Sequence, residues 1–242
     1  MSETATPPSF EISSRNRVVR RSHRGKYDKK TVYDILDSAL VCHIAYVIDG
    51  QPYCTPTAFW REGDHLYWHG SSASRMLRNQ TTGIPVCLTV THTDAMVLAR
   101  CGFNHSINYR SVMAFGKAHV IEDPAEKVTA LNSFIDRFYL DRSKVLRPPT
   151  AQEIKATSLL GMEIEQASGK IRDLPVHDEE EDYAVPAWTA LIPIRTVVGE
   201  AEECPRQLAG VTRPEGMSSY VADRRLDEIM LEAHQKLYGD DG

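Results

Sequence analysis

The sequence lacks the long hydrophobic runs that membrane spans and secretion signals require. No stretch approaches 18 apolar residues, and the first eight residues contain no apolar segment. Cysteine is scarce as well, and the five residues form neither a CxxC pair nor an even set that could be fully paired within one chain. We therefore predict a cytoplasmic protein in a reducing environment, neither exported nor membrane-spanning and with no membrane partner.

The common catalytic and nucleotide-binding motifs are absent too. The nine histidines include no HExxH or His-x-His spacing, so no metal site is predicted. Neither Gly-x-Ser-x-Gly nor the GxxxxGK[ST] and GxGxxG loops occur, which argues against a serine hydrolase and the two commonest nucleotide-binding loops. The net charge of −5 argues against a nucleic-acid partner.

What is present is an ordinary globular composition. The 242 residues are 42% hydrophobic and 25% charged, which suits one large domain with a well-buried core. Residues 1–26 are rich in Pro, Ser and Arg without periodicity and are predicted as a flexible basic arm. We expect the domain itself over residues 27–200, and a C-terminal linker and helix over residues 201–242.

The hydrophobic pattern predicts many short strands joined by tight turns, with a few helices. Asp28 and Asp123 are the expected caps of two of these helices. The spacing does not follow regular strand–helix alternation, so we predict a mainly β fold with α additions, a β-barrel in an antiparallel arrangement. Strands are predicted at 43–48, 53–61, 65–69, 86–91, 95–101, 109–121, 160–166 and 190–198, and helices at 28–39, after Ser71, at 123–138, after Pro149 and at 219–238.

A candidate phosphate site lies where a strand passes into a helix, at residues 69–75. His69, Gly70 and Ser71 are followed by Ser74 and Arg75, so backbone amides, hydroxyls and one guanidinium fall within seven residues. Each of these groups donates hydrogen bonds to anionic oxygens. The alternative is an ordinary serine-rich helix cap, which is common and binds nothing.

The order of several short motifs resembles the FMN-binding split-barrel superfamily, and more closely its pyridoxamine-phosphate-oxidase-like branch with the nitroimidazole-resistance (Nim-type) proteins. The resemblance spans residues 17–197. It implies a six-stranded antiparallel split barrel that is homodimeric and holds FMN at the dimer interface. The motifs are residues 51–59, Gly63-Asp64-x-Leu66-Tyr67, His69-Gly70-Ser71-x-x-Ser74-Arg75, Pro85-Val86-Cys87, residues 108–112 with Gly116, Asp182, Pro186-x-Trp188 and Ile192-Pro193.

The resemblance also implies which residues hold the cofactor. Ser74 and Arg75 would bind the FMN phosphate, and a strand segment would run along the isoalloxazine edge. A second segment would lie beside the ring and ribityl chain, and a third would approach from the second subunit. In that order these three segments are Pro56, Thr57, Ala58 and Phe59; His69, Gly70 and Ser71; and Asn108, Arg110 and Ser111.

Two departures from the oxidases argue against pyridoxamine-phosphate oxidation. Met76 stands where the oxidases carry a lysine, which weakens phosphate binding or shifts it to Arg78 or Arg110. The C-terminus also lacks their substrate-binding Arg and His. We therefore expect an FMN-dependent oxidoreductase that passes electrons from NADH or NADPH to a small conjugated acceptor, with no nameable catalytic side chain. The alternatives are a flavin-binding sensor or carrier and a haem-handling protein.

An acidic segment, residues 173–187, precedes Trp188. One hypothesis makes it a lid over the flavin, with Trp188 packed near the site and its charges repelling anionic substrates. The other makes it a solvated linker whose tryptophan fills the core. Two roles are likewise considered for His69: a hydrogen-bond donor to flavin or substrate, or an exposed and inert side chain.

Overall fold

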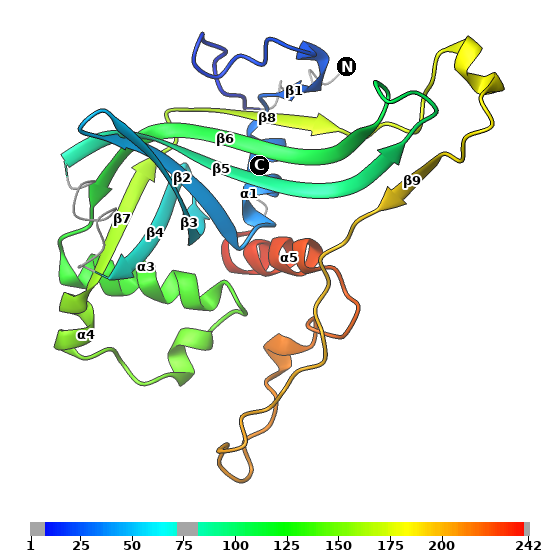
Figure 1. The fold of residues 1–242 in the computed structure, drawn as a ribbon. Coiled ribbons are helices and arrows are strands. Elements are labelled where there is room, and N and C mark those ends of the chain that lie inside the picture. Colours follow the sequence, from blue (N-terminus) through cyan, green and yellow to red (C-terminus); the bar gives the residue numbers. More distant parts are fainter. Residues whose placement is uncertain (1–7, 72–81, 240–242) are drawn as a thin grey trace, which may run out of the picture.

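The computed structural model describes residues 8–71 and 82–239. Within these residues, nine strands form one sheet with four main helices around it (Figure 1). The strands are β1 (Gly25–Lys26), β2 (Val41–Ile48), β3 (Gln51–Glu62), β4 (His65–Ser71), β5 (Thr82–Leu98), β6 (Ser106–Val120), β7 (Thr157–Glu163), β8 (Gln166–Arg172) and β9 (Ala190–Pro193). The helices are α1 (Lys29–Asp37), α3 (Pro124–Asp136), α4 (Ala151–Ala156) and α5 (Leu226–Tyr238), with 3₁₀ turns at Ser22–Arg24, Arg142–Val145, Glu180–Ala184 and Glu215–Met217.

Six of the strands close into a ring. The sheet order β6-β7-β4-β3-β2-β5 returns to β6 through a direct β5–β6 pairing, and every pairing is antiparallel. β8 and β1 extend the sheet from β6, and β9 extends it from β5. This confirms the predicted mainly β class and the six-stranded antiparallel split barrel.

Alternation along the strands fills the barrel. On β2 the side chains of Cys42, Ile44 and Tyr46 are buried, whereas Val41 and His43 face outward. Period-2 alternation of this kind is what a strand with one buried face requires. The tryptophans Trp60 and Trp68 are both fully buried, so they belong to the core.

The expected helix caps are present. The carboxylate of Asp28 accepts from the amide of Thr31, and the carboxylate of Asp123 accepts from two first-turn amides of α3. These bonds satisfy donors that have no partner inside the helix. α4 begins with a capping box between Thr150 and Glu153, after the prolines that predict a helix there.

The N-terminal segment differs from the flexible arm that the composition predicts. Residues 8–26 lie against the barrel, where Phe10 is buried and β1 pairs with β8. Asn16 is also buried, and its side-chain amide donates to the carbonyls of Glu11 and Ala167. Such anchors are isolated polar and aromatic contacts without periodicity, so a search for periodic patterns does not detect them.

Several strands differ from the predicted set; β7 and β9, for example, cover 157–163 and 190–193 in place of 160–166 and 190–198. The two strands predicted at 86–91 and 95–101 are one long strand, β5, and the polar residues between them form a bulge between Thr93 and Ala95. β8 is missing from the predicted set because its sequence, QASGKIR, has small and polar residues in place of an apolar alternation. The terminal helix begins at Leu226, later than the predicted residue 219.

Gly116 lies where β6 passes close to the end of β7. A Cβ atom at this position would lie 2.2 Å from the carbonyl oxygen of Glu163 and 2.6 Å from Cγ of Met162. We expect Gly116→Ala to lower the free energy of unfolding by about 1–3 kcal/mol, because the backbone must shift to accept the methyl group. Urea unfolding measures the change. Gly102→Ala is the control, since nothing lies within 4 Å of its Cβ position, and equal effects of the two would contradict the account.

A buried ion pair joins α1, β3 and α5. The guanidinium of Arg61 donates to both oxygens of Asp37, with the shortest distance 2.7 Å, and also to Nε2 of His234 at 2.8 Å. All three side chains are at most 3% exposed. Because Arg61 donates to Nε2, His234 is neutral and carries its proton on Nδ1. α5 is therefore fixed to the barrel by a polar contact as well as by Ile229 and Met230.

This geometry predicts a pH-dependent stability. Burial, together with the charges of Arg61 and Arg137, lowers the pKa of His234 to about 3. The unfolded chain takes up a proton near the ordinary histidine pKa that the folded chain refuses, so the free energy of unfolding falls as pH drops from about 6.5 toward 3. The slope from this group reaches at most about 1.4 kcal/mol per pH unit.

His234→Gln tests the assignment, because glutamine keeps an acceptor for Arg61 but does not titrate. Urea unfolding at several pH values should show a slope about one proton smaller than in the unaltered protein. His43→Gln, at an exposed position of β2, is the control and should keep the full slope. An unchanged slope in His234→Gln would show that this histidine does not contribute it.

Candidate flavin site

The strands β3 and β4 part at the position where the sequence places the cofactor. β4 pairs with β3 only as far as Trp68 opposite Phe59, and then continues to Ser71 alongside β7. Beyond this point β3 stays with β2, from Pro56 opposite His43 to Ala58 opposite Val41. The facing edges of the two strands are therefore not used in their mutual pairing, which makes their backbone donors and acceptors available to a ligand.

The four residues on the β3 side differ in what they present. Pro56 is exposed, and Thr57 and Ala58 are half-buried, so these three lie at the surface of the parting. Phe59 has a fully buried side chain, and its carbonyl accepts a hydrogen bond from the guanidinium of Arg137. Its ring therefore belongs to the core, and only its backbone is near the predicted cofactor edge.

His69 lies on β4 in an aromatic setting. Its ring packs edge-on against Phe134 with a centroid distance of 4.9 Å, and Trp60 lies 6.0 Å away. Burial lowers the pKa of His69, so the imidazole is neutral near pH 7. Its Nδ1 is buried and has no hydrogen-bond partner among the described residues. An unsatisfied buried nitrogen is costly, so this atom fits a ligand that supplies a partner.

The phosphate loop follows directly. Gly70 and Ser71 pair with Ser158 and Thr157 at the end of β4, so the last described residues before the predicted phosphate loop lie at the parting of the strands. The side chain of Ser71, and the predicted phosphate ligands Ser74 and Arg75, lie outside the described part of the chain, as do Met76 and Arg78. Their assignment stays a prediction from the sequence.

The three candidates on β6 lie in a different region of the barrel, toward the β9 end of β5 and β6, away from β4 (Figure 1). Asn108 is buried, and its amide group holds the chain after β8 by bonds with Arg172 and with the backbone of Leu174. Ser111 donates to the carbonyl of Lys170 at 3.4 Å. The structure therefore gives these two side chains partners within the chain, and one chain does not bring them to the β3–β4 parting.

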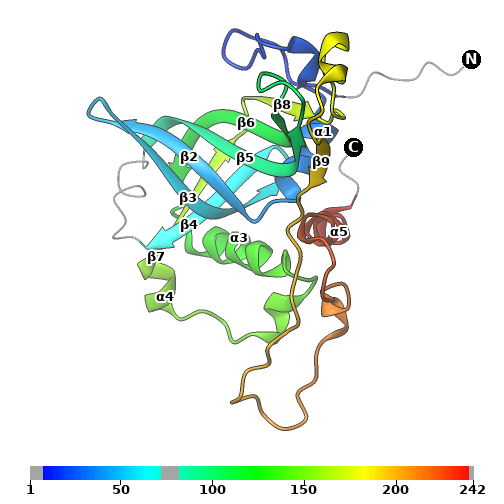
Figure 2. The same cartoon turned by 45° about the vertical axis from the view of Figure 1, so that its right-hand side comes forward.

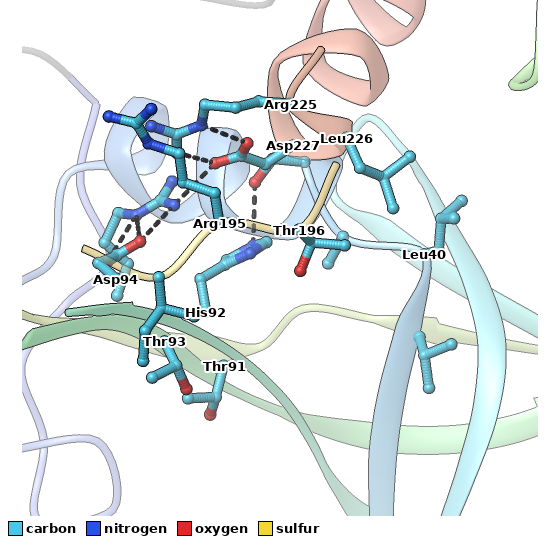
Figure 3. Close-up of a pocket in the computed structure, with 15 residues that line it drawn as sticks. Leu40, Thr91, His92, Thr93, Asp94, Arg195, Thr196, Arg225, Leu226 and Asp227 are labelled. Atoms are coloured by element: carbon cyan, nitrogen blue, oxygen red, sulfur yellow. Dashed lines mark hydrogen bonds and ion pairs between the residues drawn. The ribbon is translucent and has the colours of Figure 1, made fainter. Parts of the chain in front are cut away.

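Arg110 belongs to a second polar site, shown in Figure 3. Its guanidinium donates to Asp94 at 2.8 Å and to Asp227 at 2.8 Å, and Arg225 donates to Asp227 at 2.6 Å (Figure 3). Burial alone would raise the pKa of Asp227, but the bonds from Arg225 and Arg110 outweigh it and lower that pKa. Because two carboxylates already compensate Arg110, it is not free to replace the missing lysine of the phosphate loop.

This second site encloses a cavity of about 440 Å³ between α1, β5 and the start of α5. His92 lies in its wall (Figure 3). Its Nε2 is 3.1 Å from the hydroxyl of Ser38. Burial and the charge of Arg110 lower the pKa of His92, so it is neutral. The sequence prediction took His92 and Asp94 for the turn between two strands. The signal that could have found them is the apolar alternation on both sides, which resumes after the bulge with its buried positions shifted by one residue.

The acidic segment is anchored at Asp178 as well as at the backbone of Leu174. Asp178 is buried, and its carboxylate accepts from the amides of Arg100 and Cys101 and from the side chains of Arg100 and Asn104. The segment is therefore not a purely solvated charge run. Trp188 is 74% exposed, so it does not fill the core as the linker hypothesis expects.

The ring of six strands, parting between β3 and β4, defines a split barrel. The family model for pyridoxamine 5'-phosphate oxidase matches residues 28–171. The chain therefore belongs to the pyridoxamine 5'-phosphate oxidase family, which has the flavin-binding split-barrel fold. No curated protein matches the chain.

Solved structures extend the comparison over most of the chain. The flavocytochrome Anf3 from Azotobacter vinelandii is 42% identical, with a TM-score of 0.81, over 87% of this chain and 98% of that one. An FAD and haem binding protein from Mycobacterium smegmatis is 32% identical, with a TM-score of 0.77, over 84% and 98%. A nitroimidazole antibiotic resistance protein from Bacteroides thetaiotaomicron is 27% identical over 60% and 84%, with a TM-score of 0.49.

Proposed function

We propose that the protein is a flavin-dependent oxidoreductase that takes electrons from NADH or NADPH and passes them to a small conjugated acceptor. The observation that carries the proposal is the parting of β3 and β4, with the orphaned Nδ1 of His69 beside it, in a chain of a flavin-binding family. A bound flavin supplies the redox chemistry itself. The protein residues bind and orient the ring, and Trp60 and Phe134 beside His69 exclude water.

Two lines of support point to different flavins. The phosphate loop predicts FMN, whereas the relative from Mycobacterium smegmatis is described as binding FAD. The two cofactors share the isoalloxazine ring, the ribityl chain and the first phosphate, so the same loop suits both. We propose FAD for this chain because that relative is 32% identical over most of its length. Chromatography of the released cofactor decides between them, and FMN would support the loop prediction.

Anaerobic addition of NADH or NADPH to the flavin-loaded protein tests the oxidoreductase activity. We expect the visible flavin bands to bleach and to return when a nitro or quinone acceptor is added. A flavin that neither donor reduces would contradict the oxidoreductase proposal and favour the sensor or carrier.

We further propose a homodimer, because the sequence resemblance implies a flavin site shared by two subunits and twofold closure is the commonest. Light scattering should give about twice the chain mass of 27.2 kDa. A monomer that retains one flavin per chain would contradict the shared site.

A second candidate function is haem binding, because two relatives that are 42% and 32% identical are described as a flavocytochrome and as an FAD and haem binding protein. A mostly apolar cavity of about 1080 Å³ lies between the end of α3 and residues 201–217. Its size suits a porphyrin, and Cys204 and Met217 in its wall are residue types that bind haem iron.

Addition of haemin tests this candidate. A Soret band that saturates at one haem per chain is the expected result, and a shift of that band in Met217→Leu or Cys204→Ser would identify the ligand. Without a saturable band, the haem function is excluded and the flavin function stands alone.

A further inference from the structure

A pocket of about 710 Å³ lies outside the β3–β4 parting and carries a concentrated positive charge. We call it the basic pocket. None of its described lining residues is Asp or Glu. Five are basic: Arg20, Arg21, Arg24, Lys170 and Arg172.

Two distant parts of the chain build the basic pocket. The pairing of β1 with β8 puts Gly25 opposite Lys170, and this brings the arginines of residues 20–24 over the end of β8. In Figure 2 the N-terminal segment, the turn after β5 and the segment after β8 gather at the top of the molecule. The segment is fixed there by the buried Asn16 and by the hydroxyl of Tyr27, which accepts from the amide of Val18.

The charges of the basic pocket are not compensated within the described chain. Elsewhere arginines pair with carboxylates, for example Arg61 with Asp37 and Arg147 with Glu153. In the described residues none of the five basic side chains of the pocket forms an ion pair, although the chain has more acidic than basic residues. Burial and the nearby charge of Arg24 lower the pKa of Arg172, as expected of cations held together. An anion would relieve this repulsion.

Two details show that the arrangement is built rather than incidental. Nε of Arg24 is buried and has no hydrogen-bond partner among the residues described. Arg21 has a left-handed backbone with φ 57°, a conformation that is unfavourable for a non-glycine residue. The amide of Arg24 donates to the carbonyl of Arg21 at 2.9 Å, which closes this turn.

The ligand class follows from the other wall of the pocket. Phe103 is fully exposed there, and Tyr109, His105 and His177 add further planar rings. A guanidinium group can donate two parallel hydrogen bonds to the oxygens of one phosphate. An exposed aromatic ring can stack on a nucleobase. Phosphates and a base in one ligand define a nucleotide, and the cavity volume falls in the range of small-molecule sites.

We propose that the basic pocket binds an adenine nucleotide, with its phosphates on the arginines of residues 20–24 and Arg172 and its base against Phe103. Two molecules of the proposed function contain this group, the nicotinamide donor and the adenylate half of FAD. The choice of adenine as the base, and the choice between these two molecules, rest on the proposed function, whereas the binding of a free nucleotide does not.

Calorimetric titration of the purified protein with ADP tests the proposal. ADP should bind saturably, more weakly as salt screens the charges, and adenosine should not bind detectably. In Arg20→Gln/Arg21→Gln we expect ADP affinity to fall at least tenfold, since two charge-assisted contacts are removed. Both residues are exposed, so the fold should be kept, and unchanged thermal unfolding confirms this.

Lys155→Gln/Arg206→Gln is the matched control, with the same change of charge on α4 and in the loop after β9. Its ADP affinity should stay within twofold of the unaltered protein. Equal losses in the two double variants, or no saturable ADP binding, would overturn the nucleotide site.

Two further measurements on Arg20→Gln/Arg21→Gln distinguish whether the pocket binds the nicotinamide donor or the adenylate half of FAD. If the pocket holds the donor, KM for NADPH or NADH rises at least tenfold while the flavin content stays the same. If it holds the adenylate half of FAD, the affinity for FAD falls and that for FMN does not. Either result supports the site. A loss of both flavins alike with unchanged ADP binding would contradict it.

Discussion

Asp37→Ala should lower the free energy of unfolding by about 3–5 kcal/mol, because it breaks a buried ion pair by removing the carboxylate to which Arg61 donates. Arg61 is 2% exposed and lies over the ring of Tyr33 at 4.0 Å, so its guanidinium cannot reach water without moving. The pair and His234 link α1, β3 and α5, and the change should therefore also loosen the terminal helix. Urea unfolding at pH 7 measures the effect.

The matched control is Asp34→Ala on the same helix. Asp34 is 39% exposed and pairs with Lys30 one turn away, an arrangement that contributes only about 0.2–0.5 kcal/mol. If Asp37→Ala costs no more than Asp34→Ala, the buried pair does not hold the helices to the barrel.

Arg75→Ala should weaken FMN binding about tenfold to a hundredfold, because a charge-assisted phosphate contact contributes about 1.5–3 kcal/mol. Riboflavin, which has no phosphate, should bind to the variant and to the unaltered protein alike. Fluorescence titration of the flavin-free protein with each ligand gives the two affinities.

Arg78→Ala tests the alternative that Arg78 binds the phosphate, since Met76 stands where the oxidases carry a lysine. If the phosphate contact has moved to Arg78, this variant and not Arg75→Ala shows the selective loss of FMN. Equal losses of FMN and riboflavin in Arg75→Ala would contradict the phosphate assignment. Arg110 is not expected to take this part, because Asp94 and Asp227 already bind its guanidinium.

The meander β2–β4 was predictable because local signals agree along it. Asp49-Gly50 gives the first turn with both residues at positive φ, and alternating apolar residues on β2 set its buried face. The caps Asp28 and Asp123 likewise act on amides only a few residues away. Where the determining interaction is local, sequence patterns predict it.

The remainder depends on contacts between distant residues. Asn16 forms a hydrogen bond with Ala167, and Arg61 forms one with His234. More than a hundred residues separate the two members of each pair, and no motif or spacing in the sequence connects them. β8 is a strand because β6 and β1 pair with it, not because its residues favour one. The same pairing creates the basic pocket, so its charges appear in the sequence only as two unrelated groups.

The candidate site shows the same division. The sequence pattern put Thr57, Ala58 and His69 on two strands of the meander, and the structure shows that these strands part at those residues. It could not show that the ring of Phe59 is buried in the core or that Asp94 compensates Arg110, since both depend on how the sheet closes.

The most direct test of a flavin-dependent function is the absorption spectrum of the purified protein, before and after addition of excess FMN or FAD and removal of the unbound cofactor. The account predicts the two absorption bands of an oxidised flavin at a stoichiometry of one per chain. A colourless protein that retains neither FMN nor FAD after this treatment would contradict it.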